Sequence, residues 1–280
     1  MSYQCTESFS EVARGHDREG FVYHAMIFKL YFDDSSDDQH KKLRACAGLI
    51  GTANQWDILL ALWSHVTRTY GLKKPFRAAD CEGGHGQFKW WKKPRRDALM
   101  AELVTAILNS KLMGYGGIVP VEEYAKAFPT AKEDDCYFLA VRQVIMNAAY
   151  ITHSLGHDVS IWFEKDGKTD AEVERIFDSI SRFSAWPDSR ALRSITGSNK
   201  KLIPLQTADL IAREGFKHID NLGKRPMRLP AQRMLGHLAY FHWNEKSLKY
   251  LAENGGPENL AVLASWDERN APRMGHYIWK

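Results

Sequence analysis

The feature that most constrains this chain is an apolar run that ends at two acids. Residues 23–32 are apolar or aromatic with two exceptions, and Asp33, Asp34 and two serines follow directly. A short run rich in aromatic and branched residues is typical of a strand buried on both faces of a sheet. A carboxylate at the end of such a strand is costly to bury unless it is paired or holds a cation. The run therefore predicts a central strand that carries an acid into a polar site.

Two further acids follow apolar sequence downstream. Glu164 closes a short apolar run, and Asp209 lies within a second one that has helical spacing. On that helix, Asp209 shares a face with apolar residues, whereas an alternative apolar stripe through Leu210 and Ile211 would turn it toward the boundary. Taken singly, each acid is also explained by a polar turn or by a helix dipole. Taken together, three acids on separate elements predict a cage for a divalent cation.

The chemistry expected of such a cage is hydrolysis of a phosphodiester. Mg²⁺ and Mn²⁺ prefer carboxylate and water oxygens, and two ions about 3.5–4 Å apart activate water and stabilise the leaving oxygen. No nucleophilic side chain is needed. The alternatives are a zinc site beginning at Cys81 and His85, or a Cys81 nucleophile with His85 or His153 as base. The zinc site is weaker because no second Cys/His pair with suitable spacing follows. The nucleophile is weaker because one cysteine with scattered histidines commonly arises by chance.

A basic and aromatic segment predicts a nucleic-acid partner more strongly than the mild net charge of +4 does. Cations interleaved with indoles suit a phosphate backbone flanked by stackable bases, although a solvated loop entering a helix would have the same composition. The candidate substrate-binding residues are Lys89, Trp90, Lys92, Lys93, Arg95 and Arg96.

The order of expected elements indicates an α/β protein. Strands near 22–33 and 43–51 form an antiparallel hairpin, with an acidic turn at 33–38 between them. Helices near 54–70, 95–109, 137–155, 170–183 and 230–240 alternate with strands near 114–121, 159–164 and 191–196, and a further helix carries Asp209. The glycine-rich stretch 75–94 predicts an irregular, functional loop. This pattern predicts a central mixed sheet flanked by helices.

The domain prediction is an irregular segment at 1–20, one α/β domain at 21–245 and an extension at 246–280 packed on it. No stretch is long and apolar enough to span a bilayer, and the N-terminus lacks the apolar core of a secretory signal. We therefore expect a cytoplasmic protein with no membrane partner and with reduced thiols at its four cysteines. The sequence leaves the oligomeric state open.

Three segments together resemble the prokaryotic and phage family known as domain of unknown function 3800. They are Tyr31-Phe32-Asp33-Asp34-Ser35, Asp80 before a Gly-rich loop ending in Phe88, and Pro204-Leu205-Gln206-Thr207-Ala208-Asp209-Leu210. The resemblance spans residues 23–218. It departs from the family pattern at Asp34, where the family has Glu, at Ser36, where it has Gly, and at Arg77, where it has His.

The resemblance implies a ribonuclease H-like fold in which acids from the first strand, a middle strand and the last helix meet at one metal site. It implies that Asp33 and Asp209 hold the metal, that Glu164 takes the strand-end position and that Asp80 is a fourth ligand or positioning group. Asp34, Ser35, Gln206 and Glu214 are the expected secondary residues.

Our leading prediction is a nuclease that depends on Mg²⁺ or Mn²⁺ and acts on DNA or RNA, with Asp33, Glu164 and Asp209 as metal ligands. A second reading is a non-catalytic nucleic-acid-binding or assembly module on the same fold. A third is a hydrolase or transferase for a small phosphorylated substrate, whose affinity would respond little to salt.

Overall fold

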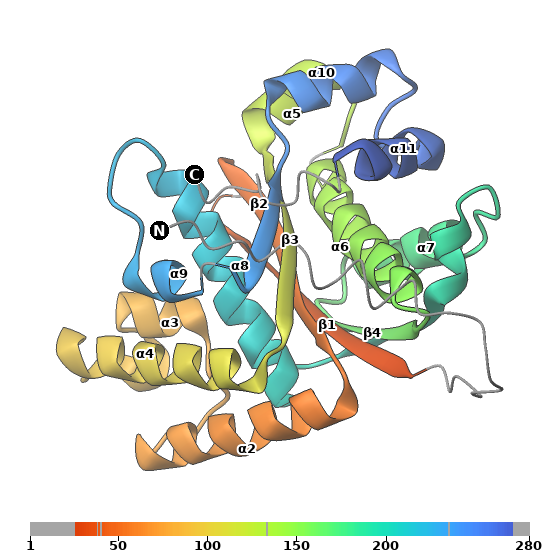
Figure 1. Ribbon diagram of the computed structural model, residues 1–280. Helices are drawn as coiled ribbons and strands as arrows, with labels where there is room; N and C mark the ends of the chain where they lie inside the picture. The colour runs from red at the N-terminus through yellow and green to blue at the C-terminus, as the bar shows by residue number, and fades with distance from the viewer. Residues whose placement is uncertain (1–25, 38, 40, 133, 235, 271–280) are drawn as a thin grey trace, which may run out of the picture.

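The protein folds around one six-stranded mixed sheet with helices on both faces (Figure 1). The computed structural model describes residues 26–37, 39, 41–132, 134–234 and 236–270. The strand order is β5-β4-β1-β2-β3-β6. The expected α/β architecture, a central mixed sheet flanked by helices, is confirmed, and β1 is one of the two central strands of that sheet. The expected irregular segment at 1–20 lies outside the described residues.

The sheet is opened by an antiparallel hairpin of β1 (Ile27–Ser36) and β2 (Leu43–Gly51), as the sequence predicts. The expected acidic turn at 33–38 is wrong in its first half, because β1 continues through both acids and Ser36 pairs with Arg44. Strand β3 (Met113–Pro120) pairs antiparallel with β2. The two acids of β1 therefore lie inside the sheet and alternate between its faces.

Two parallel strands extend the sheet on the other side of β1. Strand β4 (Asp158–Glu164) pairs with β1, and β5 (Leu192–Ser198) pairs with β4. Parallel strands need a crossover connection. Helix α7 (Asp170–Ser181) and the 3₁₀ helix η2 (Pro187–Ala191) make the connection from β4 to β5.

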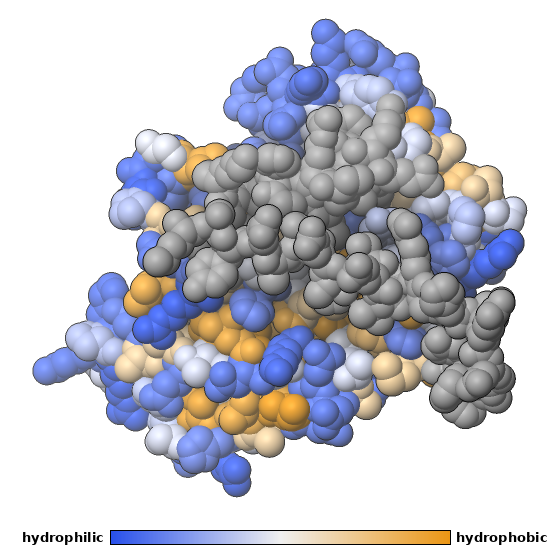
Figure 2. All heavy atoms as spheres, viewed as in Figure 1, coloured by the Kyte–Doolittle hydropathy of each residue, from blue (hydrophilic) through white to orange (hydrophobic). Residues whose placement is uncertain are grey.

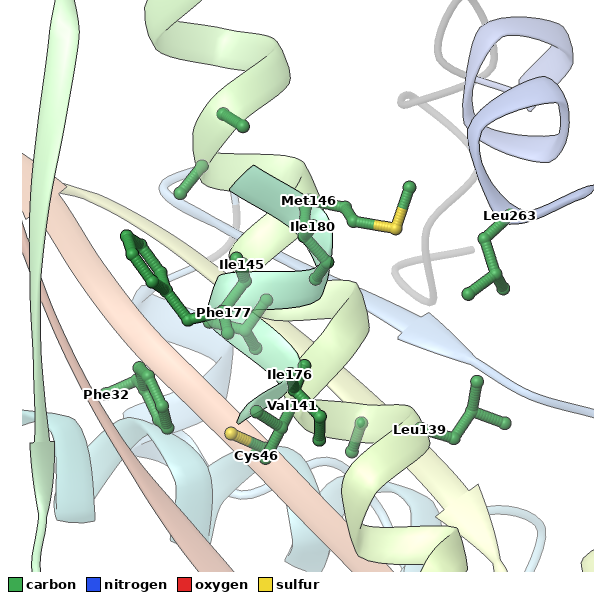
Figure 3. Packing of buried hydrophobic residues seen from close by; sticks show 14 of the residues in the cluster. Phe32, Cys46, Leu139, Val141, Ile145, Met146, Ile176, Phe177, Ile180 and Leu263 are labelled. Carbon is green, nitrogen blue, oxygen red and sulfur yellow. The ribbon is translucent and has the colours of Figure 1, made fainter. Parts of the chain in front are cut away.

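One face of the sheet is covered by the long helix α6 (Asp135–Ser154), with α7 beside it (Figure 1). Figure 3 shows Cys46 of β2 beside Val141 of α6, and Phe32 of β1 and Ile145 of α6 belong to the same buried cluster. Residues 28, 30 and 32 of β1 all belong to this buried cluster. The period of two therefore assigns the even-numbered residues of β1 to the α6 face.

The other face of the sheet packs against α8 (Ile203–Asn221), with α2 (Ala53–Thr69) and α4 (Lys93–Ser110) outside it. Helix α2 begins at a capping box in which Thr52 and Gln55 satisfy each other's backbone amides. Tyr31 of β1 packs against this second cluster. The odd-numbered residues of β1 therefore face α8.

The stretch from 75 to 94 is less irregular than predicted. It contains α3 (Ala78–Gly83) and the 3₁₀ helix η1 (Gly86–Phe88). Helix α3 ends at Gly84, whose φ of 70° lies in the left-handed region that glycine adopts without strain. The segment is held inward by Phe76 and Phe88, which are both fully buried.

The predicted helix at 230–240 is wrong. A short helix, α9 (Leu229–Arg233), ends before Gly236, and strand β6 (Leu238–His242) follows and pairs parallel with β3. Gly236 has φ 83°, which a continuing right-handed helix cannot accommodate. The final strand thus adds a sixth member to the sheet.

The last described elements are α10 (Glu245–Glu253) and α11 (Leu260–Asn270); α10 packs beside α5 (Val121–Ala127). Leu248, Leu251 and Leu263 point into the same buried cluster as α6, while the outward surface at the top of the molecule is hydrophilic (Figure 2). None of the described helices is both long and apolar enough to cross a bilayer.

Candidate functional site

Three of the four predicted acids meet at one point, and that point holds the ammonium group of Lys200. Nζ of Lys200 lies 2.9 Å from Oδ2 of Asp33, 2.8 Å from Oε2 of Glu164 and 3.1 Å from Oδ1 of Asp209. We call these four residues the acid–lysine cluster. Its carboxylates come from β1, β4 and α8, which are far apart in the sequence.

The register of two parallel strands places Asp33 and Glu164 together. Tyr31 is paired with Trp162, so the acids two positions later lie on the same face of neighbouring strands. The rings of Tyr31 and Trp162 stack on this face, with centroids 4.9 Å apart. The alternation expected for Ser160, Trp162 and Glu164 is present, because the residues between them are buried on the α6 side.

Asp209 enters the cluster from the buried side of α8, where it is only 8% exposed. Its Oδ2 accepts a hydrogen bond of 2.6 Å from the backbone amide of Ala78, and its Oδ1 accepts one from Nζ of Lys200. The carboxylate therefore joins the first turn of α3 to the cluster. Of the two orientations open from sequence, the one with Asp209 turned inward is found.

Gln206, one turn before Asp209, fixes the two segments that flank the cluster. Its Oε1 accepts hydrogen bonds from the amide of Phe76, at 3.0 Å, and from the indole of Trp63, at 3.4 Å. Its Nε2 donates to the backbone carbonyl of Lys200 at 2.9 Å. The side chain thus holds the connection between β5 and α8 in place, which positions the lysine.

Burial and crowding dominate the electrostatics of the cluster. Burial raises the pKa of Asp33 well above its ordinary value; Lys200 opposes this shift, and the neighbouring acids add to it. Burial by itself lowers the pKa of Lys200, but Asp33, Asp209 and Glu164 together outweigh it and raise the pKa. The lysine is therefore charged at neutral pH, and the cluster contains three carboxylates for one cation.

Oδ2 of Asp33 is buried and makes no hydrogen bond with the described residues. Its contact with Lys200 at 2.9 Å is an ion pair without hydrogen-bond geometry. A buried carboxylate oxygen satisfied only by charge is the kind of donor that a hard cation coordinates.

The segment at 75–94 contacts the acid–lysine cluster through Arg77 and Ala78. Arg77 reaches it, with Nη2 3.8 Å from Oε1 of Glu164. Asp80 is not among the acids that contact Lys200. Its Oδ2 lies so close to Gly86 that a side chain at that position would have its Cβ 3.0 Å away. The carboxylate of Asp80 therefore lies beside the loop that follows α3. A role for Asp80 as a fourth ligand or positioning group stays a prediction.

Asp34 and Ser35 follow the alternation of β1. Ser35 shares the face of Asp33, whereas Asp34 lies on the opposite face. Burial raises the pKa of Asp34, and Arg44 opposes the shift. The backbone amide of Asp34 donates to Oδ1 of Asp33 at 2.9 Å, so the pair also fixes the orientation of the first acid.

Glu214 is fully buried on α8, away from Lys200, and lies 3.1 Å from Nη2 of Arg228. Burial raises its pKa to about 7, against the effect of Arg228. Cys81, the alternative nucleophile, is also fully buried, and burial raises the pKa of its thiol to about 12. A thiol with this pKa is not ionised at neutral pH and is a poor nucleophile.

The predicted basic and aromatic segment divides into two kinds of residue. Arg95 and Arg96 hold the loop: the guanidinium of Arg95 lies 3.9 Å from the ring centre of Trp91, and Arg96 donates to the carbonyl of Trp91 at 2.8 Å. In contrast, Trp90 is 86% exposed, with Nζ of Lys89 5.1 Å from its ring. Lys92 and Lys93 are also exposed.

The donor set of the cluster fits a divalent cation, but its centre holds the lysine. In the described part of the chain, no group of three or more His, Cys, Asp or Glu side chains is arranged to hold a metal as it stands. The oxygens lie 2.8–3.1 Å from Nζ, whereas Mg²⁺ needs about 2.0–2.1 Å. Metal binding would therefore require Lys200 to withdraw and the carboxylates to close by about 1 Å.

Lys200 is the site residue that the sequence reasoning missed. It lies four residues before the motif that begins at Pro204 and six residues before Gln206. The signal that could have found it is a lysine nine residues before an acid that is expected to be buried.

Comparison with known proteins gives little further information. No protein-family model matches the chain, and no curated protein matches it. Among solved structures, the chain is similar to one in the PCNA:RNase HII complex from Archaeoglobus fulgidus, with 13% sequence identity and a TM-score of 0.39. The match covers 87% of this chain and 90% of that one.

Proposed function

We propose that this protein is a nuclease that hydrolyses phosphodiester bonds at the acid–lysine cluster with the aid of a divalent metal ion. The observation that carries the proposal is the convergence of Asp33, Glu164 and Asp209 on one point occupied by positive charge. Three carboxylates are costly to assemble in a buried place. Such a cost is typical of a site whose purpose is to hold a cation.

The residues that would hold Mg²⁺ or Mn²⁺ are Asp33, Glu164 and Asp209. When bound, the ion would supply an activated water and stabilise the leaving oxygen. The chain's own contribution is positional: Gln206 and the amide of Ala78 hold α8 and the segment 76–78 in register. The exposed Trp90 and Lys89 suit a stacked base and a phosphate.

A non-catalytic nucleic-acid-binding module is the second candidate, and a specific observation favours it. The ammonium of Lys200 already neutralises part of the cluster and is only 12% exposed. A lysine that stays there permanently would make the cluster a structural ion network. The two candidates differ in whether a divalent cation can replace Nζ.

The test is cleavage of labelled single-stranded and double-stranded DNA and RNA by the full-length chain in Mn²⁺ and in Mg²⁺. The variants are Glu164→Gln and Asp209→Asn, with Asp178→Asn, an exposed acid on α7, as the matched control. We expect cleavage by the wild type and the control and none by the two cluster variants. Undiminished cleavage by either cluster variant removes that residue from the mechanism.

Calorimetry with Mn²⁺ separates the two candidates. Binding by the wild type that is lost in Asp33→Asn supports the nuclease. Oligonucleotide binding without any Mn²⁺ binding or cleavage supports the non-catalytic module. Affinity for a small phosphorylated compound with little dependence on salt would instead support the third reading from the sequence.

A further inference from the structure

A second polar site lies beside the acid–lysine cluster, and its charge is of the opposite sign. A cavity of about 380 Å³ opens between α3, α4, the end of α8 and the segment that leads to α9. Figure 1 shows α3, α4 and α9 next to one another. Two carboxylates, Glu82 and Asp97, line it together with five cations. The cations are Lys93, Arg96, Lys217, Arg225 and Arg228.

Both carboxylates of this basic cavity are already neutralised. Oε2 of Glu82 accepts from Nε of Arg213 at 2.8 Å, and its Oε1 lies 3.0 Å from Nη1 of Arg228. Asp97 pairs with Lys93 at 2.6 Å. Burial alone would raise the pKa of Glu82, but Arg228 and Arg213 outweigh it and lower the pKa. The cavity therefore keeps an excess of positive charge.

Two of the cations have no acidic partner among the residues that the structure describes. Arg225 forms no ion pair there, and Arg96 donates to the backbone carbonyls of Trp91 and Glu82, at 2.8 and 3.5 Å. Cations that converge on an open cavity without a matching acid form a site for an anion. Guanidinium groups in particular suit the oxygens of a phosphate.

The basic cavity and the acid–lysine cluster lie along one stripe of α8. Asp209, Arg213, Lys217 and Asn221 follow one another at intervals of four residues, which puts them on the same side of the helix. Asp209 belongs to the cluster, and Lys217 and Asn221 line the cavity. Eight residues of helix separate Asp209 from Lys217, a distance of about 12 Å.

Helix α3 joins the same two sites by a shorter route. Its first amide, at Ala78, is bonded to Asp209, and Cys81 and Glu82 near its other end line the cavity. In a nucleic-acid duplex, successive phosphates of one strand advance by about 3.4 Å along the axis. The distance along α8 therefore equals about three or four nucleotides.

We propose that the basic cavity is a phosphate-binding subsite that holds a backbone phosphate of the nucleic acid three or four nucleotides from the bond that is cut. This inference rests on the proposed nuclease function and adds a second point of contact to it. The subsite would set the position of the strand relative to Asp33, Glu164 and Asp209. It carries no sequence information, because phosphates are the same at every nucleotide.

The test is the salt dependence of oligonucleotide binding, measured by fluorescence anisotropy in EDTA so that no cleavage occurs. The variant is Lys93→Ala with Arg225→Ala, two exposed cavity residues whose loss leaves the core intact. The control is Lys126→Ala with Arg182→Ala. Lys93 and Lys126 are 76% and 70% exposed, and each pairs with an acid four residues away.

We expect several-fold weaker binding by the cavity variant and a slope of log K against log[salt] that is shallower by about one to two. The control should keep the wild-type slope. An unchanged slope in the cavity variant, or an equal change in the control, overturns the subsite.

A parallel titration with inorganic phosphate identifies the source of the phosphate. The assignment to a nucleic-acid backbone is overturned by one combination of results. Inorganic phosphate binds through Lys93 and Arg225, while the salt dependence of oligonucleotide binding does not change when these two residues are replaced. The nuclease proposal is tested separately, because it is overturned if the wild type does not cleave in Mn²⁺. That outcome does not affect the binding measured in EDTA. A wild type that cleaves and a cavity variant with an unchanged slope overturn the subsite alone.

Discussion

Nζ of Lys200 lies 2.9 Å from Oδ2 of Asp33, and both side chains are buried, with 12% and 1% of their surfaces exposed. Asp33 belongs to the central strand of the sheet, and Lys200 belongs to the connection before α8. The ion pair therefore links the β1 core to the segment that carries Gln206 and Asp209. The long side chain of Lys200 thus occupies the position where the proposed function needs a metal ion.

The first prediction concerns this lysine. Lys200→Met keeps the apolar stem and removes the charge, which leaves three crowded carboxylates without their cation. Breaking a buried ion pair in this way costs about 3 kcal/mol. In EDTA at pH 7 we expect the free energy of unfolding to fall by about that amount, and we expect Mn²⁺ to restore most of it. Urea unfolding followed by tryptophan fluorescence measures both effects.

Lys201→Met is the matched control for this experiment, because Lys201 is the neighbouring residue and is exposed. Its stability should stay within about 0.5 kcal/mol of the wild type. Equal stability of the two variants in EDTA would contradict the buried ion pair. Loss of stability in Lys200→Met without recovery in Mn²⁺ would contradict the cation site and favour a structural network.

The second prediction concerns pH and Glu214. Its pKa is about 7 in the folded chain and 4.5 in the unfolded chain. Between these values the folded chain binds more protons, so this carboxyl makes the protein less stable as the pH rises from 4.5 to 7. A shift of this size corresponds to roughly 3 kcal/mol. Glu214→Gln, which lacks the titrating group, should gain stability over the wild type across this range.

The measurement is the unfolding free energy of both proteins at pH 5, 6, 7 and 8. The difference in favour of Glu214→Gln should grow up to about pH 7 and then become constant. Glu174→Gln, an exposed site on α7, should show no such trend. A difference that is independent of pH would mean that Glu214 has an ordinary pKa and that Arg228 compensates its burial fully.

The sequence predicted those parts of the fold that local pattern determines. The apolar run before Asp33 and the short connection to the next strand were sufficient for the antiparallel hairpin. Alternation within 159–164 was sufficient to place Glu164 on the face opposite Val159 and Phe163. These features depend on side-chain period, which the sequence states directly.

The errors arose where the backbone overrides the pattern. The apolar spacing of residues 230–240 is compatible with one continuous helix and also with a short helix followed by a strand. The left-handed conformation of Gly236 decides for the second arrangement. Asp80 was grouped with the other acids because the resemblance implies a metal ligand or positioning group at that place in the middle segment. That segment bonds to α8 through the amides of Phe76 and Ala78 and through the carboxylate of Glu82. Such bonds are set by tertiary packing and leave no trace in local pattern.

The third prediction concerns Gln206. Gln206→Glu keeps an oxygen for the amide of Phe76 but replaces the donor that faces the carbonyl of Lys200. Two oxygens would then face each other at 2.9 Å, and a charge would be partly buried. We expect a loss of about 1–3 kcal/mol in unfolding free energy.

Gln87→Glu is the comparison for this change. Gln87 also accepts from backbone amides, at Lys73 and Lys74, and donates to the carbonyls of Lys74 and Pro75. It is less buried than Gln206, so water can replace its lost bonds and the cost should be smaller. An equal cost at both sites, measured by urea unfolding, would show that burial of Gln206 contributes nothing.

The last prediction concerns Arg77, which stands where the resembling family has His. Its side chain is 57% exposed and its contact with Glu164 is 3.8 Å long, so the pair contributes less than about 1 kcal/mol to stability. Its positive charge nevertheless lies next to the carboxylates and opposes the approach of a divalent cation. Arg77→Gln should therefore bind Mn²⁺ more tightly than the wild type, by several-fold at low salt, with a nearly unchanged free energy of unfolding.

Lys73→Gln, which removes an exposed cation earlier in the same segment, should leave the Mn²⁺ affinity unchanged. Calorimetry at two salt concentrations checks the assignment, because screening should reduce the difference. Tighter binding in both variants would mean that the effect comes from net charge and not from the position of Arg77.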